Sequence, residues 1–186
     1  MKKGRGSSQK AKEIIISGEL LQVFGLGVLI TGDSGIGKSE CALELITRKH
    51  RFVSDDVVQI RKGGDGRLQG SAPSLSRNFM EIRGLGLINI KEIFGFKALL
   101  KKARIDLVIT LKKWERGKEY DRIGLKFPAD CLILGVKVPQ ISIPVAPGRN
   151  IAMLVEVACR VHLLRQKGYR ASEEMVRKLD RALSVQ

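Results

Sequence analysis

The stretch Gly32-Asp33-Ser34-Gly35-Ile36-Gly37-Lys38-Ser39 decides the fold predicted for this chain. It matches the pattern G-x-x-x-x-G-K-[ST]. An apolar run, residues 27–31, precedes it, and apolar residues recur at helical spacing in residues 40–49 behind it. A strand, a glycine-rich loop and a helix in direct succession predict an α/β protein with a P-loop (Walker A) core that binds a nucleotide.

The chemistry of this loop follows from its residue types. Glycines let successive backbone N–H groups surround phosphate oxygens, and the N-terminus of the following helix adds partial positive charge. Lys38 is predicted to reach the β- and γ-phosphates of a nucleoside triphosphate, and the Ser39 hydroxyl is predicted to ligate Mg²⁺. The loop predicts the phosphoryl donor but not the acceptor.

Asp55 and Asp56 are the next candidates, because they interrupt an apolar segment, residues 52–60. Charged side chains are rare in such a segment unless a metal, a partner or chemistry compensates them. If the segment is one strand, the two carboxylates point to opposite faces of the sheet. One of them is a candidate general base for the acceptor hydroxyl. The alternative is that the pair only orients a metal ion.

The rest of the pattern predicts short strands and further helices. We expect strands at residues 14–16, 20–24, 27–31, 52–60, 105–111, 132–138 and 140–145, and helices at residues 40–49, 151–167 and from Ser172, which is expected to cap the last one. Residues 63–66 predict a hairpin turn, and residues 70–83 and 112–121 are expected to be loops. The predicted fold is a mixed sheet carrying the P-loop core, a small flanking β-sheet formed by the early strands and the hairpin, and C-terminal helices.

Length and composition indicate one globular domain. The chain has 186 residues, 44% of them hydrophobic, and a formal net charge of +15. We expect a domain at residues 14–186, preceded by a basic flexible tail at residues 1–13. The positive charge suits phosphates or acidic partners, whereas an aromatic content of only 5% and the lack of a nucleic-acid-binding motif argue against a specific nucleic-acid partner.

Cysteine usage and hydropathy predict a protein of the cytoplasm. Cys41, Cys131 and Cys159 lie far apart in apolar surroundings and form no metal or redox motif, so we expect three buried thiols in a reducing compartment. The apolar stretch at residues 14–30 contains Glu19 and Gln22 and is short for a membrane helix. We therefore expect no membrane association.

Five blocks of this sequence resemble, in order, the bacterial HPr kinase/phosphorylase family. They are residues 32–40 (GDSGIGKSE), 50–56 (HRFVSDD), 80–88 (MEIRGLGLI), 120–125 (YDRIGL) and 143–152 (IPVAPGRNIA). The resemblance extends from about residue 17 to residue 167, which is nearly the whole chain. Chance agreement of five separate blocks in the family's order is very improbable.

The resemblance implies an enzyme that phosphorylates a serine of HPr, the phosphocarrier protein of the sugar phosphotransferase system, with ATP or pyrophosphate as donor. It also implies the reverse reaction, in which inorganic phosphate removes the phosphoryl group and pyrophosphate is released, and it implies a hexamer. By motif, Lys38 would bind the phosphates, Ser39 and Glu81 would hold Mg²⁺, and Asp55 with Asp56 would supply the acid and base. Arg122 would stabilise the group in transfer, because a guanidinium suits a pair of phosphoryl oxygens.

Two further segments of the resemblance concern the protein partner and the reverse reaction. Glu81, Arg83 and Gly84 belong to the block that lines the site in the family. Pro147, Gly148 and Arg149 belong to a loop associated with phosphorolysis and with contact to HPr, and Arg149 is a candidate phosphate ligand there. Without the resemblance, these residues would be interpreted as a strand-end ion pair and a helix-entry turn.

The chain departs from the family in two respects. Family members usually carry His in a pattern like H-G-V-L-V, whereas Ser17-Gly18-Glu19-Leu20-Leu21 stands here. Serine donates a hydrogen bond but brings no positive charge, so the kinase direction is better supported than phosphorolysis. Typical members also have a domain ahead of the catalytic one, so we expect either a short form or a truncated chain.

Two other functions remain open at the level of the sequence. A small-metabolite kinase with a P-loop would need acceptor-binding segments, for which only residues 70–83 and 112–121 are available. A nucleotide-binding regulator that has lost catalysis is suggested by Ser17 in the place of the family's His. Activity on small alcohols would favour the first, and tight ATP binding without turnover would favour the second.

Overall fold

The computed structural model describes residues 12–117 and 129–184. The elements, in chain order, are β1 (Glu13–Ser17), β2 (Glu19–Val23), β3 (Leu26–Gly32), α1 (Lys38–Thr47), β4 (Arg51–Ser54), β5 (Val57–Lys62), β6 (Leu68–Ser71), β7 (Phe79–Ile82), β8 (Gly86–Asn89), α2 (Ile90–Phe94), the 3₁₀ turn η1 (Phe96–Ala98), β9 (Lys102–Arg104), β10 (Leu107–Lys113), β11 (Asp130–Ile133), β12 (Val136–Val145), α3 (Ile151–Gln166) and α4 (Ala171–Leu183).

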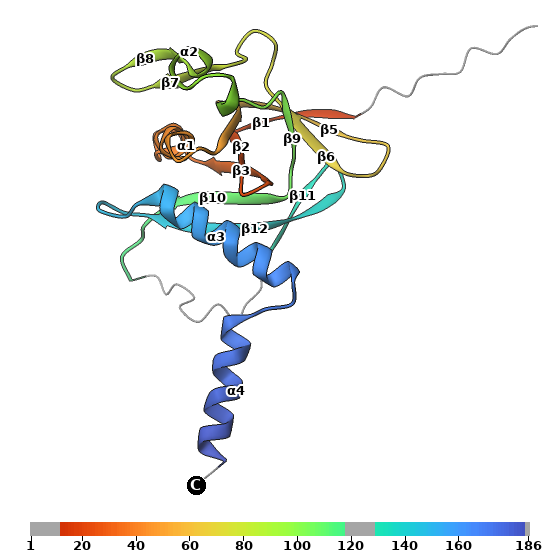
Figure 1. The fold of residues 1–186 in the computed structure, drawn as a ribbon, viewed down its shortest axis with the longest axis vertical. Coiled ribbons are helices and arrows are strands. Elements are labelled where there is room, and N and C mark those ends of the chain that lie inside the picture. Colours follow the sequence, from red (N-terminus) through yellow and green to blue (C-terminus); the bar gives the residue numbers. More distant parts are fainter. Residues whose placement is uncertain (1–11, 118–128, 185–186) are drawn as a thin grey trace, which may run out of the picture.

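A six-stranded mixed sheet forms the centre of the fold (Figure 1), as predicted. Its strand order is β11-β12-β10-β3-β2-β4, and β3, β10 and β12 run parallel while the outer pairs are antiparallel. The loop after β3 and the turn after β12 therefore leave the same edge of the sheet. In open α/β sheets, ligands bind at this carboxyl edge of the parallel strands.

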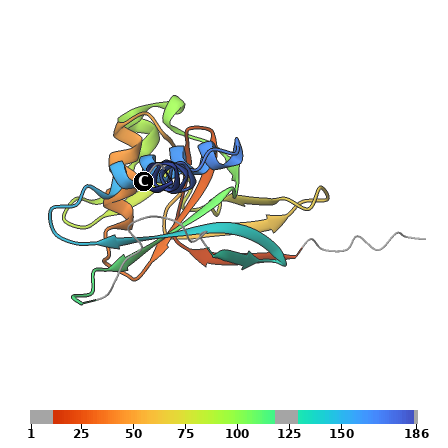
Figure 2. The same cartoon turned by 90° about the horizontal axis from the view of Figure 1, so that it is seen from below.

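Both faces of this central sheet are covered. On β3, Val28 and Ile30 pack against α1 and α3, whereas Leu29 between them packs against the second sheet. That second sheet has the order β1-β5-β6-β9 and is antiparallel throughout. Figure 2 shows the two layers of strands with the helices on one side. Burial on both faces explains why residues 27–31 are apolar without alternation.

The predicted assignment of strands to sheets was wrong for residues 20–24. They form β2, which belongs to the central sheet and not to the small one. Phe24 and Gly25 both adopt positive φ, 50° and 86°, and make a tight two-residue turn that returns the chain as β3 beside β2. Turns of this kind match the twist of a hairpin, so the two strands pair directly.

Other boundaries also differ from the prediction. Residues 70–83 are not one loop, because β6 ends at Ser71 and β7 begins at Phe79. The break expected at residue 139 lies instead at Leu134 and Gly135, both with positive φ, so β12 runs through Pro139. Ser172 does not cap α4 but lies inside it. Glu13 belongs to β1 and not to the basic tail; residues 1–11 lie outside the described ranges.

The three cysteines are free thiols, but they are not equally buried. Cys41 and Cys159 lie in the core, whereas Cys131 is half-buried, contrary to the prediction. Burial raises the pKa of Cys41 and of Cys159 to about 12. These two side chains therefore remain protonated, apolar packing groups at neutral pH.

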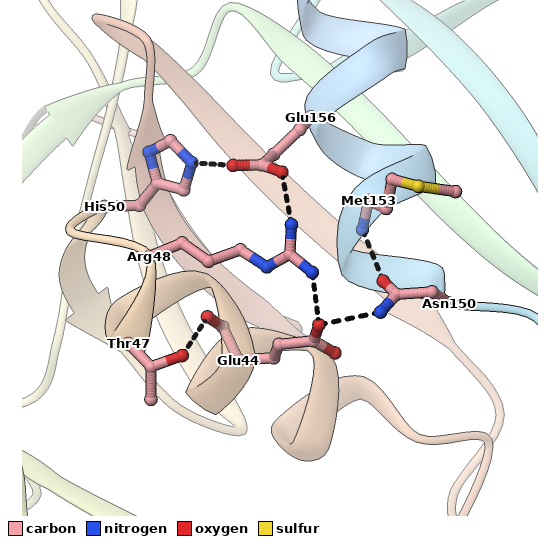
Figure 3. Close-up of polar contacts among 7 residues, drawn as sticks. All are labelled: Glu44, Thr47, Arg48, His50, Asn150, Met153 and Glu156. Atoms are coloured by element: carbon pink, nitrogen blue, oxygen red, sulfur yellow. Dashed lines mark hydrogen bonds and ion pairs between the residues drawn. The ribbon is translucent and has the colours of Figure 1, made fainter.

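A polar network joins α1 to α3 (Figure 3). Arg48 donates to Glu44 and to Glu156 at 2.6 and 2.8 Å, and Glu156 also bonds the buried His50 at 2.8 Å. Asn150, which caps α3 by accepting from the Met153 N–H, donates to Glu44 at 2.8 Å. Because Glu44 accepts from both Arg48 and Asn150, its pKa is lowered. The helix that follows the 32–39 loop is thus fixed to the start of α3.

Helix α4 projects away from the rest of the domain (Figure 1) and contains no buried residue. Its apolar side chains are exposed, and so is a row on α3. The exposed residues are Met153, Val157, Val161 and Leu164 on α3, and Met175, Val176, Leu179 and Leu183 on α4. None of the helices in the described ranges is long and apolar enough to span a membrane.

Candidate active site

The loop at residues 32–39 joins β3 to α1 at the carboxyl edge of the central sheet. Gly35 and Gly37 have φ values of 75° and 99°, a backbone conformation that other residues adopt only at a cost. Gly37 is also the N-cap of α1, so no side chain closes the start of this helix. The free backbone N–H groups and the helix dipole give this end of α1 the partial positive charge that anions prefer.

Lys38 folds back across this loop. Its ammonium group donates to the carbonyl oxygens of Gly32 and Asp33 at 3.2 and 3.1 Å, and the residue is only 8% exposed. Within the described residues, no carboxylate forms an ion pair with Lys38. A largely buried cation whose partners are two neutral carbonyl groups is a suitable counter-charge for an anion.

Asp55 and Asp56 do not lie within one strand, as the sequence analysis had assumed. They form the turn between β4 and β5, and Asp56 has a φ of 57°. The Gly18 N–H donates to the Asp56 carbonyl at 3.1 Å and fixes the turn beside the end of β1. The aspartates differ in environment because a turn replaces the strand: Asp55 is 8% exposed, whereas Asp56 is exposed and faces the loop.

Glu81, Arg83 and Gly84 lie on the hairpin of β7 and β8, which stands over the loop. Asp55 accepts a hydrogen bond from the Glu81 backbone N–H at 2.9 Å and thereby ties the hairpin to the aspartate turn. Arg83 reaches the loop itself, since a Cβ atom added at Gly35 would lie 3.5 Å from its guanidinium Nη1. A larger residue than glycine at position 35 would crowd this guanidinium.

These three segments enclose a polar cavity of about 170 Å³. Its lining residues are Ser34, Gly35, Gly37, Lys38, Ser39, Glu40, Asp56, Glu81 and Arg83. Most of the residues predicted from the motif therefore come together here with two cations and three carboxylates. Glu40, which helps to line the cavity, was part of the motif block but was not among the predicted site residues.

The donor set of this cavity suits Mg²⁺ bound together with a phosphorylated ligand. Within residues 12–117 and 129–184, no three His, Cys, Asp or Glu side chains are grouped closely enough to hold a metal ion by themselves. Mg²⁺ is commonly held by one or two carboxylates while phosphates and water complete its shell. The Ser39 hydroxyl and the Glu81 carboxylate are oxygen donors of this kind.

Glu19 was not predicted as a site residue. It lies on β2 behind the loop, is 0% exposed, and its Oε1 accepts a hydrogen bond from the Ser39 hydroxyl at 3.2 Å. Burial, a hydrogen bond with Asp55 and the charges of Asp55 and Asp56 raise the pKa of Glu19 to about 10. Glu19 is therefore protonated at neutral pH. The only signal in the sequence was a glutamate within an apolar stretch.

The turn that contains Pro147, Gly148 and Arg149 does not line this polar cavity. Arg149 donates to the Pro144 carbonyl and lies 5.6 Å from the centre of the Trp114 ring. Gly148 and Arg149 line a second cavity of about 430 Å³, which shares Gly37 and Glu40 with the first. Arg122 lies outside the described residues.

The fold and the site define an α/β protein in which a loop of the pattern G-x-x-x-x-G-K-[ST] faces a carboxylate-bearing turn across a polar cavity. The model of one family, the HPr Serine kinase C-terminal domain, matches residues 8–179 of the chain. The chain belongs to this family.

Individual relatives agree with this assignment. The chain is 50% identical over 169 residues to the HPr kinase/phosphorylase of Caldanaerobacter subterraneus, covering 91% of this chain and 55% of that protein. It is 51% identical over 164 residues to the HPr kinase/phosphorylase of Geobacter sulfurreducens, covering 88% of this chain and 51% of that protein. The chain thus spans about half the length of these curated relatives.

A solved structure resembles the whole described fold. The HPr(Ser) kinase/phosphatase from Coxiella burnetii superposes with a TM-score of 0.77 at 37% sequence identity, covering 87% of this chain and 98% of that one. The mixed sheet and the helices found here are therefore the arrangement of a known HPr(Ser) kinase/phosphatase.

Proposed function

We propose that this chain is a catalytic domain that transfers the γ-phosphoryl group of ATP to a serine hydroxyl of HPr in the cytoplasm. The observation that carries this proposal is Lys38, a largely buried cation held on the 32–39 loop at the wall of the polar cavity. The names of the relatives, HPr kinase/phosphorylase, support HPr as the acceptor. Identity of 50% over 91% of the chain supports a shared reaction.

Each residue of the cavity has a role in this proposal. The 32–39 loop and Lys38 bind the phosphates, while Ser39 and Glu81 hold Mg²⁺, which neutralises phosphate charge when bound. The Asp55–Asp56 turn takes the proton of the serine hydroxyl as its oxygen forms the new bond to the γ-phosphorus and ADP leaves. Arg83 lies where it can contact the phosphoryl oxygens, and Arg122 remains a candidate for the same role by motif.

The size of the cavity supports a protein as acceptor. About 170 Å³ with a polar lining holds phosphate groups but cannot also enclose a metabolite, because enclosed small-molecule sites usually measure several hundred Å³. The hairpin at the rim carries the exposed side chains of Leu85 and Leu87, and such side chains are typical of protein contacts. The acceptor serine therefore enters on a protein surface that docks at this rim.

The reverse reaction uses the same groups. Inorganic phosphate attacks the phosphorus of phosphoserine-HPr, pyrophosphate leaves, and the serine oxygen takes a proton back from the aspartate turn. Ser17, which stands where the family usually has His, is exposed and pairs with Val57 next to this turn. Since serine brings no positive charge to an anion, we propose that phosphorolysis is slower than phosphorylation.

The second cavity is the proposed location of the nucleoside. Its volume of about 430 Å³ is in the range of small-molecule sites, and it adjoins the polar cavity at Gly37 and Glu40. We expect ATP to bind at least tenfold more tightly than inorganic tripolyphosphate, measured by calorimetry with Mg²⁺. Equal affinities would contradict this location, because they would leave the nucleoside without contacts.

A homo-oligomer is proposed on the basis of the exposed apolar side chains of α3 and α4. Soluble monomers rarely expose contiguous apolar patches of more than a few hundred Å². An amphipathic helix with no buried residue needs a second surface, and another copy of the chain is the simplest one. By resemblance to the family, the oligomer is a hexamer.

The decisive experiment for the proposed function is the mass of HPr after incubation with this chain, Mg²⁺ and ATP. We expect one phosphoryl adduct on a serine of HPr, and loss of this adduct when ATP is removed and inorganic phosphate is added. Unmodified HPr in the presence of bound ATP would favour a nucleotide-binding regulator. Phosphorylation of small alcohols instead of HPr would favour a metabolite kinase.

A further inference from the structure

Three buried side-chain atoms in the described part of the chain have no hydrogen-bond partner, and two of them lie behind the 32–39 loop. They are Glu19 Oε2 and Asp55 Oδ1. Buried polar atoms without a partner are rare, and they concentrate at functional sites. The other oxygen of each carboxyl group is engaged, Glu19 Oε1 by the Ser39 hydroxyl and Asp55 Oδ2 by the Glu81 N–H. Glu19 thus lies between two parts of the proposed active site.

The bond from Ser39 to Glu19 fixes the direction of the hydroxyl hydrogen. A serine hydroxyl can rotate, and it has one hydrogen to donate and two lone pairs that can be given to a cation. Because Glu19 accepts the hydrogen, the lone pairs of Ser39 are left for a ligand on the side away from Glu19. A partner behind a metal ligand that holds the ligand in one orientation commonly strengthens metal binding.

The position of Glu19 in the fold makes it a rigid acceptor. It lies on β2, which is hydrogen-bonded to β3 on one side and to β4 on the other. The side chain is 0% exposed, so water does not compete for the Ser39 hydroxyl. Its pKa, raised by burial and by Asp55, is consistent with a neutral carboxyl group that accepts from Ser39 and does not attract the cation itself.

We propose that Glu19 is a positioning residue of the phosphoryl-transfer site: its carboxyl group accepts the Ser39 hydroxyl hydrogen and so directs the Ser39 oxygen toward Mg²⁺. This inference rests on the proposed function, because it assigns a task to a residue that supports the same site. Glu19 contacts neither the nucleotide nor the cation in this role. It acts through Ser39 alone.

The experiment compares three variants with the unsubstituted protein. Glu19→Gln retains a carbonyl oxygen that accepts from Ser39, whereas Glu19→Leu has a similar size and no acceptor. Leu21→Ala, a buried residue on the same strand without contact to Ser39, is the matched control for loss of packing. Binding of a non-hydrolysable ATP analogue is measured by calorimetry, once over a series of Mg²⁺ concentrations and once in EDTA.

We expect Glu19→Leu to raise about tenfold the Mg²⁺ concentration that gives half-maximal binding, while the dissociation constant in EDTA changes less than about threefold. Glu19→Gln is expected to stay within about threefold of the unsubstituted protein in both series. Leu21→Ala is expected to lower the unfolding temperature without changing the Mg²⁺ dependence.

Two results would overturn the inference alone. One is an unchanged Mg²⁺ dependence in Glu19→Leu, and the other is an equal loss of binding with and without Mg²⁺, which would make Glu19 a packing residue. If the unsubstituted protein itself fails to bind the analogue with Mg²⁺, the proposed function fails and the inference fails with it. The two failures are distinguished by the unsubstituted protein.

Discussion

Replacing Lys38 by alanine is expected to lower the rate of HPr phosphorylation about 10³-fold or more. Lys38 is only 8% exposed, and its described partners are the carbonyl groups of Gly32 and Asp33. In such a poorly solvated site, a fixed positive charge stabilises the charge that spreads over the phosphoryl oxygens during transfer. Alanine removes this charge and leaves the carbonyl oxygens facing the phosphates. The initial rate is measured from the mass of HPr.

Two controls separate this effect from loss of the fold. Lys62→Ala removes a lysine at the exposed end of β5 and is expected to change the rate less than twofold. The circular dichroism spectrum of Lys38→Ala should match that of the unsubstituted chain, because the side chain lies at the start of α1 and not in the apolar core. A rate within tenfold of normal would contradict the role given to Lys38.

Replacing Glu19 by glutamine is expected to stabilise the protein at pH 7 by about 3 kcal/mol. The buried Glu19 carboxyl group keeps its proton up to a pKa of about 10, whereas in the unfolded chain it ionises near 4.5. Protonating it at pH 7 costs about 1.4 kcal/mol for each pH unit above the unfolded value. Glutamine has nearly the same shape, accepts from Ser39 and carries no such cost.

The pH dependence of this difference has a definite sign. Between about pH 4.5 and 10 the folded protein binds a proton at Glu19 that the unfolded chain lacks, so its stability falls as the pH rises. The advantage of Glu19→Gln should be near zero at pH 4 and grow by about 1.4 kcal/mol per pH unit above 4.5. Urea unfolding from pH 5 to pH 8, without Mg²⁺ and nucleotide, measures it. A difference that does not vary with pH would show that Glu19 is ionised in the folded state.

The central fold could be predicted because the local signals agreed with one another. Residues 27–31 are apolar on both faces, a glycine-rich loop follows, and a helix with apolar residues at regular spacing comes next. Such a unit needs a parallel neighbour, and β10 and β12 supply it. The placement of β2 could not be predicted, since it depends on the positive φ of Phe24, which a sequence pattern does not indicate.

The candidate site could be predicted only in part, for a similar reason. The motif brought Lys38 and Ser39 into view, because their roles depend on neighbours in the chain. The contact of Asp55 with the Glu81 N–H, and that of Glu19 with Ser39, join residues 26 and 20 positions apart. Periodicity within one element carries no information on such contacts, and the expected strand at Asp55 and Asp56 is a turn.

Helix α4 gives this protein two levels of local stability. Thirteen residues without a buried side chain are close to the length at which a helix in water is marginal on its own. On a lone chain, α4 therefore unfolds locally many times for each global unfolding event, exchanging its amide hydrogens quickly and offering sites to proteases. Helix α3, with Ala152, Val155 and Cys159 in the core, opens only with the domain. Covering α4 would join the two helices into one cooperative unit.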